Sequence, residues 1–305
     1  MYKILLWVGG NFYERILNQV NYEIEKGNIC VIGMIVKQED KYCKYKDGFL
    51  VLTKNEIEEY EYDYIVSTVE NYSDILREAM TIGIDRKRII DGHVLFLPLF
   101  DFAKYAALIE NPVTIISNDC WSGFVYRKLR LPLTSPFINI QWDIKQFSEF
   151  ILDPIYYLQS KLEILEEGDI KRGIYPIGRL GDGNKKVQFN FIHSLNGEDV
   201  RNQWDRRLKR VNYNNIFIKM GFRSNLPDEE KNRYIDSYRK IKQKKILFYY
   251  GNDVEDSFKT DRFISYKAED VVSSFNYDTY MQVNYHYDIN LFDLLLYGDK
   301  YSRCQ

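Results

Sequence analysis

The sequence is poor in the residues and spacings that identify metal-binding, secreted and membrane proteins. It has only 4 cysteines in 305 residues, without a CxxC or Cys–His spacing, so it indicates neither a structural zinc site nor a disulfide framework. It also lacks an Asp-x-Asp pair that would hold a divalent metal beside a nucleotide sugar, and we therefore expect no metal. No apolar run approaches the roughly 20 residues that span a bilayer, and MYKILLWVGG is too short for a signal peptide. These absences predict a cytoplasmic protein that is not an integral membrane protein.

An excess of charge of one sign is missing as well. The chain has 42 Lys and Arg against 44 Asp and Glu, a formal net charge of −2, which argues against a nucleic-acid partner bound by a broad basic face. Hydrophobic residues make up 45% of the chain, and its length suits two domains with a core each. The 26 tyrosines suit contacts with carbohydrate or protein, although an AT-rich genome would give the same bias.

The first third of the chain alternates between apolar runs and helical patterns. The runs predict buried strands at Lys3–Val8, Ile29–Val36, Phe49–Leu52, Tyr62–Thr68 and Arg88–Ile90. Helical spacing follows the first strand and returns over Tyr72–Ile82, while Thr53 and Glu56 predict a capping box. This alternation predicts a parallel, right-handed α/β sheet over residues 1–108.

The turn after the first predicted strand lies where dinucleotide-binding domains hold a pyrophosphate. Its residues are Gly9, Gly10 and Asn11. The glycine fingerprint is incomplete, because aligning Gly10 with the second glycine puts Val8 at the first and Tyr13 at the third. The second strand runs into Lys37 where a carboxylate would hold a ribose. We therefore expect no nicotinamide cofactor, and an oxidoreductase is disfavoured, but the turn remains a candidate for binding a nucleotide-linked phosphate through backbone N–H groups.

This part of the chain resembles the small Rossmann-like domains of bacterial capsule and exopolysaccharide proteins. The resemblance lies in the glycine turn and in the strand Tyr62–Val66. It implies that the domain either binds a nucleotide or sugar nucleotide or only organises the chain.

The stretch Val113–Pro136 has the pattern of a strand, a polar loop and a helix that begins at Phe124. Side chains leave the carboxyl end of a strand there, and a helix start offers N–H groups to a ligand. The candidate site residues in the loop are Ser117, Asn118, Asp119, Cys120 and Trp121. The alternative is that Asp119 or Ser122 only caps the helix and that Cys120 is a buried packing residue.

Two further segments of the second half carry candidate residues. The strand Lys186–His193 delivers His193 at its end, and the helix Gly197–Asn212 is rich in arginine. In this helix Trp204, Arg207 and Arg210 lie about one turn apart, an arrangement suited to a phosphate or a sugar carboxylate. The alternative is a solvated face with Trp204 turned to the core.

The rest of the second half predicts several other elements. They are a strand at Phe137–Trp142, a helix of about twenty residues from Phe147 to Leu165, a hairpin turn at Gly181–Gly183, strands at Ile216–Met220, Lys245–Tyr250 and Phe263–Tyr266, a helix at Asp228–Lys242, and a strand with a terminal helix within Tyr280–Asp299.

Ordered motifs in the second half resemble a bacterial exopolysaccharide-biosynthesis family, domain of unknown function 1919. They are Ile116–Trp121, Tyr126–Leu129, Leu131–Pro132, Ser135–Pro136, Tyr175–Leu180, Phe191–His193 and Trp204–Asn212. The sequence departs from the family's usual Asn at Asp119, its Gly at Ser122 and its aromatic residue at Ser194, so no role is carried over that needs an amide at position 119. The resemblance implies a setting in surface-polysaccharide synthesis and implies no reaction.

Together these patterns predict a two-domain α/β protein, with a Rossmann-like parallel sheet in residues 1–108 and a larger α/β domain in residues 109–305. The first hypothesis for its function is a transferase that moves a sugar, a phosphate-linked group or an acyl group onto a glycan precursor. In it His193 is the general base, Asp119 and Asn118 orient it or the acceptor, Arg207 and Arg210 neutralise donor phosphates, and Trp121, Trp204 and Ser117 complete the substrate site. The alternative is a non-catalytic protein that binds a sugar nucleotide or associates with other polysaccharide-assembly enzymes.

Overall fold

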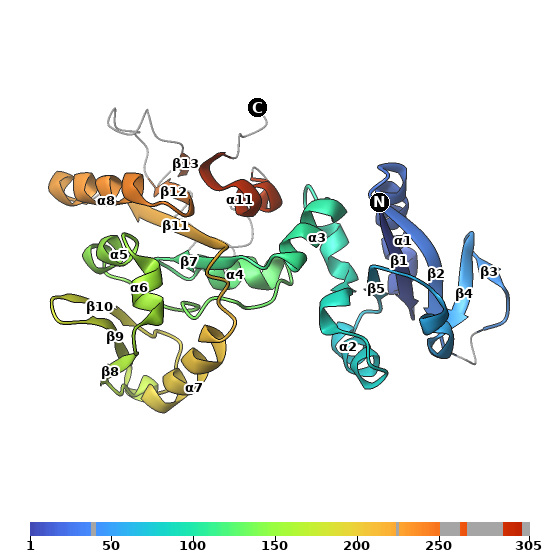
Figure 1. Cartoon of the computed structure of the whole chain (residues 1–305), viewed down its shortest axis with the longest axis horizontal. Coiled ribbons are helices and arrows are strands. Elements are labelled where there is room, and N and C mark those ends of the chain that lie inside the picture. The colour runs from blue at the N-terminus through green and yellow to red at the C-terminus, as the bar shows by residue number, and fades with distance from the viewer. Residues whose placement is uncertain (38–40, 224–225, 251–262, 267–288, 301–305) are drawn as a thin grey trace. The chain divides into compact units, whose positions relative to one another are not determined.

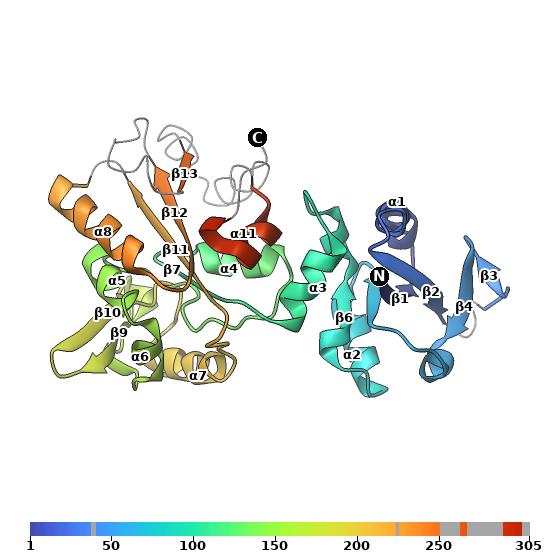
Figure 2. The same cartoon turned by 45° about the horizontal axis from the view of Figure 1, so that its top comes forward.

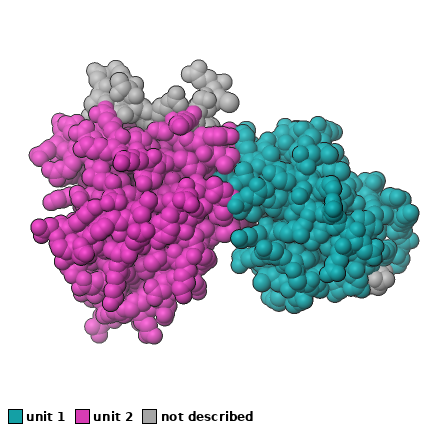
Figure 3. All heavy atoms as spheres, in the orientation of Figure 1, with its two compact units in different colours: residues 1–110 teal, residues 111–305 magenta. Residues whose placement is uncertain are grey.

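The computed structural model describes residues 1–37, 41–223, 226–250, 263–266 and 289–300. The chain divides into two compact units, unit 1 (Met1–Glu110) and unit 2 (Asn111–Gln305), which Figure 3 colours separately. Each unit combines helices with a sheet that contains parallel strands, so the mixed α/β class predicted from the sequence is confirmed. Among the described residues, no helix is both long enough and apolar enough to cross a membrane.

Unit 1 is built on a six-stranded sheet with the order β3-β4-β2-β1-β5-β6 (Figures 1 and 2). The strands are β1 (Tyr2–Val8), β2 (Ile29–Val36), β3 (Tyr45–Lys46), β4 (Phe49–Thr53), β5 (Tyr64–Thr68) and β6 (Ile89–Asp91). All neighbours are parallel except β3 and β4. The central strand β1 pairs with β2 on one side and with β5 on the other, so the strand order reverses direction at β1. The five strands predicted in this unit are confirmed to within two residues at each end.

The helices of unit 1 follow the strands as the sequence predicts. They are α1 (Phe12–Glu25), α2 (Tyr72–Thr81) and α3 (Phe102–Glu110), with 3-10 helices at Lys54–Glu59, Arg86–Arg88 and Gly92–Phe96. The predicted capping box is present, because the Thr53 and Glu56 side chains each meet the other residue's backbone. Both faces of the central strands are covered, and Ile4, Leu5 and Leu6 have no exposed surface.

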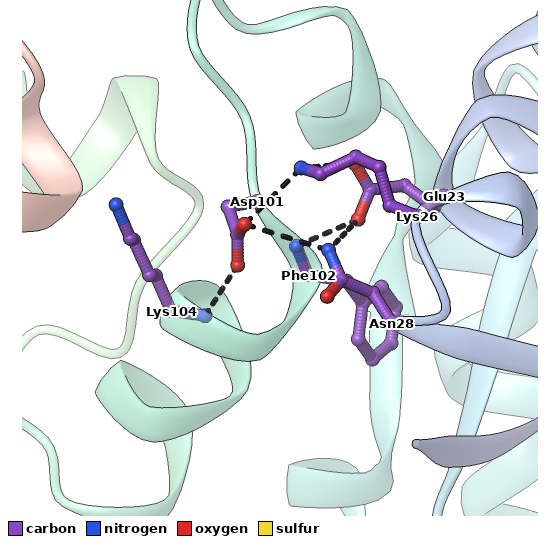
Figure 4. Close-up of polar contacts among 6 residues, drawn as sticks. All are labelled: Glu23, Lys26, Asn28, Asp101, Phe102 and Lys104. Atoms are coloured by element: carbon purple, nitrogen blue, oxygen red, sulfur yellow. Dashed lines mark hydrogen bonds and ion pairs between the residues drawn. The ribbon is translucent and has the colours of Figure 1, made fainter.

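A buried carboxylate fixes the start of α3 (Figure 4). The Glu23 side chain on α1 accepts hydrogen bonds from Asn28 Nδ2 at 2.7 Å and from the main-chain N–H of Phe102 at 3.0 Å. Lys26 Nζ lies 3.2 Å from Glu23 and 3.1 Å from Asp101, the residue before α3. Because the first N–H groups of a helix have no intrahelical partner, Glu23 both satisfies one of them and ties α3 to α1.

The described part of unit 2 contains two sheets (Figure 2). A parallel sheet has the order β13-β12-β11-β7, and an antiparallel sheet has the order β10-β9-β8. The strands are β7 (Thr114–Ser117), β8 (Glu163–Glu166), β9 (Ile177–Asp182), β10 (Lys185–Asn190), β11 (Ile216–Arg223), β12 (Lys244–Tyr250) and β13 (Phe263–Tyr266). The predicted hairpin is confirmed as the β9–β10 pair.

The described part of unit 2 also contains α-helices. They are α4 (Trp121–Lys128), α5 (Ile144–Phe150), α6 (Pro154–Gln159), α7 (Gly197–Leu208), α8 (Asp228–Lys240) and α11 (Leu291–Tyr297). An aromatic cluster fills the core between them, in which Phe137 meets Trp142, Phe189 and Trp204 at ring centroid distances of 5.2–5.6 Å. Of the predicted terminal segment, α11 is confirmed, and the preceding residues 280–288 lie outside the described residues.

Two predicted elements of unit 2 are wrong, and a third begins earlier than predicted. The helix of about twenty residues is broken between α5 and α6, because Pro154 cannot donate to a preceding carbonyl and Asp153 instead starts a new helix. Phe137–Trp142 is not a strand: its chain turns at Asn139, which has a φ of 62°. The helix predicted from Phe124 already begins at Trp121.

Candidate functional site

The loop between β7 and α4 is held together by its own polar groups. Ser117 Oγ donates to the carbonyl oxygen of Asp119 at 2.6 Å and accepts from the main-chain N–H of Ser122 at 3.1 Å. Asp119 Oδ1 accepts from the main-chain N–H of Trp121 at 3.1 Å, and the N–H of Gly123 donates to the Cys120 carbonyl. The first N–H groups of α4 are therefore satisfied by the chain itself, so this helix start is not an open anion site.

The side-chain amide of Asn118 joins two parallel strands. Its Nδ2 donates to the carbonyl oxygen of Gly221 at 2.7 Å, and its Oδ1 accepts from the N–H of the same glycine at 2.9 Å. Asn118 thereby extends the pairing of β7 with β11 beyond the end of β7. The two hydrogen bonds show that Asn118, a predicted site residue, fixes the position of the loop relative to β11.

Asp119 pairs with a buried lysine that the sequence did not single out. Lys219 lies on β11 beside Ser117, its side chain is fully buried, and its Nζ is 2.5 Å from Asp119 Oδ2. Burial lowers the pKa of Lys219, although the charge and hydrogen bond of Asp119 act in the opposite direction. An Ile-Lys-Met run in a buried strand was the available signal, because a lysine there needs a partner.

His193 approaches the loop, and its neighbour there is Cys120. The strand β10 ends at Asn190, so His193 lies in the turn beyond it, where it is exposed. Its Nε2 is 3.9 Å from the Sγ of Cys120, which is buried. The structure therefore brings together Asp119, Cys120, His193 and Lys219 from three segments of unit 2.

The two tryptophans of the predicted substrate site are core residues in the structure. Trp121 is 1% exposed and packs against Phe217 and Phe248. Trp204 is 2% exposed and packs against Phe137 and other aromatic rings. Neither indole offers a face to a sugar in this arrangement. For Trp204 the alternative interpretation of the sequence, in which its side chain is turned to the core, is confirmed.

The predicted arginines bond to main-chain carbonyl oxygens outside this loop. Arg207 donates to the carbonyl oxygen of Ile138 at 3.4 Å, and burial, followed by the charges of Arg206 and Arg210, lowers its pKa. Arg210 follows the end of α7, and its Nε donates to the carbonyl oxygen of Arg206. In the described part of the chain, no hydrogen bond joins Arg207 or Arg210 to residues 118–121 or to His193.

Unit 1 has a cavity of about 970 Å³ at the carboxyl ends of its strands. The predicted Gly9, Gly10 and Asn11 line it, together with the first residue of α1, Phe12. Gly10 has a φ of 65°, which favours glycine, and a Cβ there would meet no atom within 4 Å. Within the described residues, the Asn11 side chain makes no capping hydrogen bond to α1, so the first turn of this helix faces the cavity without a side-chain cap.

Three cations and two carboxylates line this cavity. Arg15 on α1 is 3.4 Å from Glu70, and Lys54 after β4 is 3.1 Å from Glu78. Lys37, at the end of β2, also lines the cavity. With three cations against two carboxylates, the lining has a net positive charge that favours an anionic ligand.

One histidine with two carboxylate neighbours, beside this cavity, was not singled out in the sequence. Nδ1 of His93 lies 2.7 Å from Oδ1 of Asp91, the last residue of β6, and its Nε2 lies 3.8 Å from Oε1 of Glu70. The His93 ring stacks on Phe12 with the centroids 4.2 Å apart. An Asp-Gly-His sequence at the end of a buried strand was the available signal, and Gly92 is required there because a Cβ would collide with the carbonyl oxygen of Ser67.

Neither group of side chains forms an evident metal site. Among the residues that the structure describes, no three His, Cys, Asp or Glu side chains are placed to hold a metal ion.

Comparison with known proteins covers both units. The family described as "C2185-like, N-terminal" matches residues 1–90. An uncharacterized protein of Haemophilus influenzae is 25% identical over 123 residues, which are 40% of this chain and 56% of that protein, so the chain spans little more than half the length of this relative. A second family profile matches residues 91–296, more than half of the chain. The chain belongs to the family of that profile, Domain of unknown function (DUF1919).

Proposed function

We propose that unit 1 is a Rossmann-like domain that binds the phosphates of a sugar nucleotide, in the setting of surface-polysaccharide synthesis in the cytoplasm. The strand order β4-β2-β1-β5-β6 is that of dinucleotide-binding domains, and ligands of such sheets bind where the order reverses. The cavity lies at this point, at the carboxyl ends of β1 and its neighbours.

One observation carries this proposal: the first turn of α1, which its N-cap side chain does not cap, opens into a positively charged cavity. Backbone N–H groups and the positive end of the helix dipole bind phosphate at such a position. The start of α4 in unit 2 is closed by Ser117 and Asp119, so it lacks this property. A volume of about 970 Å³ accommodates a nucleotide with an attached sugar.

Calorimetric titration of the full-length protein with uridine, guanosine, thymidine and cytidine sugar nucleotides tests this proposal. We expect one of them to bind, and Gly10→Ala to weaken its binding about tenfold because the added methyl group enters the cavity. Gly48→Ala is the matched control: Gly48 also has a positive φ and open space around it, but it lies outside the cavity. The absence of heat with every donor would rule the proposal out.

The second candidate function is a transferase whose reaction takes place at the carboxyl end of β7 in unit 2. The approach of Cys120 to His193 and of Asp119 to Lys219 favours it, because an imidazole, a thiol and an ion pair from separate segments converge there. In this proposal His193 is the general base for transfer of a sugar, phosphate-linked or acyl group onto a glycan precursor.

Transfer assays with a panel of donors and acceptors test the second candidate. His193→Ala is expected to abolish transfer without unfolding the protein, and full activity of this variant would end the assignment. Tight binding of a donor without any product would instead favour a non-catalytic protein that presents a sugar nucleotide to other polysaccharide-assembly enzymes.

A further inference from the structure

A chain of three ionisable side chains leads from the cavity of unit 1 into its interior. Glu70, after β5, lines the cavity, and 69% of its side chain is exposed. His93 lies behind it with Nε2 3.8 Å from Glu70 Oε1, and 29% of its side chain is exposed. Asp91, 2.7 Å from the other ring nitrogen, is 4% exposed. Exposure therefore falls from the cavity inward along the three residues.

Capping of a 3-10 helix explains the position of Asp91, but it does not explain the arrangement of all three side chains. Asp91 accepts the main-chain N–H of His93 at 3.1 Å and so caps the 3-10 helix Gly92–Phe96. That cap needs no imidazole at position 93. The contact of Nδ1 with Asp91 and the stacking on Phe12 instead hold the ring with its second nitrogen toward Glu70. A carboxylate that orients a histidine in this way is a common arrangement in proton transfer.

We propose that Glu70, assisted by His93 and Asp91, is the general base of a glycosyl transfer from a sugar nucleotide bound in the cavity of unit 1. This inference rests on the proposed binding of a sugar nucleotide there, and it adds a reaction to that binding. Glu70 is the catalytic residue because it lines the cavity, whereas His93 and Asp91 are positioning residues that act through it.

The elements around Glu70 supply the other groups that the reaction needs. The acceptor's hydroxyl oxygen forms a bond to the anomeric carbon of the donor, and its proton passes to the Glu70 carboxylate. The bond between that carbon and the diphosphate oxygen breaks, and its electron pair leaves with the nucleoside diphosphate. Arg15, 3.4 Å from Glu70, and the first turn of α1 lie where they stabilise the charge of this leaving group.

The test uses the full-length protein and the sugar nucleotide that binds most tightly in calorimetry. Release of free nucleoside diphosphate is followed with water and with simple sugars as acceptors. Glu70→Gln should lower kcat about 100-fold while the Kd of the donor changes less than about threefold, since general-base catalysis contributes 10²–10⁴-fold. His93→Phe, which keeps a ring to stack on Phe12, should lower kcat at least about tenfold with an unchanged KM.

The matched control is Glu61→Gln. Glu61 is an exposed carboxylate of the same unit, 3.3 Å from Lys3 and outside the lining of the cavity, and its substitution should leave kcat and Kd unchanged. Circular dichroism and thermal melting establish that each variant is folded.

Four other outcomes would overturn the inference. A wild-type kcat in Glu70→Gln overturns the inference. Loss of nucleoside diphosphate release in His193→Asn, with release retained in Glu70→Gln, also overturns it, because that result would place the reaction in unit 2. Binding of a donor without release of nucleoside diphosphate in the presence of any acceptor also overturns it but leaves the binding proposal intact. If no donor binds, both the inference and the binding proposal fail.

Discussion

The Nζ atom of Lys219 lies 2.5 Å from Oδ2 of Asp119, and the lysine side chain is fully buried whereas 43% of the aspartate side chain is exposed. A buried ammonium group loses its hydration, so the charge of Lys219 is stabilised by the partly exposed carboxylate of Asp119. Asp119 therefore stabilises the interior of unit 2 as well as the loop that precedes α4.

Replacing Asp119 by Asn should lower the free energy of unfolding by about 2 kcal/mol, because a buried charge loses its counter-charge while Asp119's partial exposure moderates the effect. Urea denaturation at pH 7 measures the change. Asp236→Asn is the control, since Asp236 forms an exposed ion pair with Arg239 at 3.5 Å and should lose less than about 0.5 kcal/mol. Equal losses in the two variants would show that Lys219 does not depend on Asp119.

Glu23 gives a second prediction, in unit 1. Glu23→Ala should lower the free energy of unfolding by about 3 kcal/mol, because it leaves the Phe102 N–H and the Asn28 amide without their buried acceptor. The neighbouring Glu25 is exposed, so Glu25→Ala should change the stability by less than about 0.5 kcal/mol. A loss below about 1 kcal/mol in Glu23→Ala would mean that α3 does not depend on this contact.

The fold of unit 1 could be predicted because its strands are local, continuous apolar runs. β1 and β5 are buried along most of their length, so their composition alone distinguishes them from helices. The capping box was predictable for the same reason, because it lies within four residues. The two-residue strand β3 was missed because Tyr45 and Lys46 are exposed and carry no periodic pattern.

Elements of unit 2 that depend on tertiary packing could not be predicted in this way. Apolar and polar residues of Phe137–Trp142 alternate as in a strand, but Phe137 and Trp142 point into one aromatic cluster from an irregular chain. The break at Pro154 was visible in the sequence, yet apolar periodicity on both sides concealed it.

In the candidate sites, too, features formed by neighbouring residues could be predicted, whereas contacts between residues far apart in the sequence could not. The sequence located Gly9 and Gly10 at a strand end, where the cavity lies. It did not reveal Lys219, because the partner of Asp119 is 100 residues away in the chain. The contact of His93 with Glu70 likewise depends on β5 and β6 being neighbours in the sheet.

The capping box of unit 1 should respond to acid. The hydrogen bonds of Lys41 and of Thr53 lower the pKa of Glu56 to about 2. Because the pKa in the folded state is depressed, the stabilisation is present above the ordinary value of 4.5 and is lost as the pH falls toward about 2. Glu56→Gln should therefore be less stable than the wild type by about 1 kcal/mol at pH 6 and equal to it near pH 2.

Urea denaturation of both proteins between pH 2 and pH 6 measures this difference. Glu58→Gln is the control, because Glu58 lies on the same 3-10 helix and is exposed. A difference between the wild type and Glu56→Gln that does not change with pH would show that the charge of Glu56 has no part in the cap.

Lys244 at the start of β12 should make unit 2 more stable in mild alkali. Its Nζ donates to the carbonyl oxygen of Leu295 on α11 at 2.7 Å, and burial lowers its pKa from 10.5 to about 8. Between pH 8 and pH 10.5 the unfolded chain therefore binds more protons at this group than the folded chain, so the free energy of unfolding rises with pH. Relative to Lys244→Met, the wild type should gain on the order of 1 kcal/mol across this range, a value reduced for the partial exposure of the side chain.

Chemical denaturation of both proteins from pH 7 to pH 10.5 measures the gain. The control is Lys242→Met, a change at an exposed position two residues earlier. A wild type that loses stability relative to Lys244→Met over this range would mean that Lys244 is held in its charged form by the folded protein.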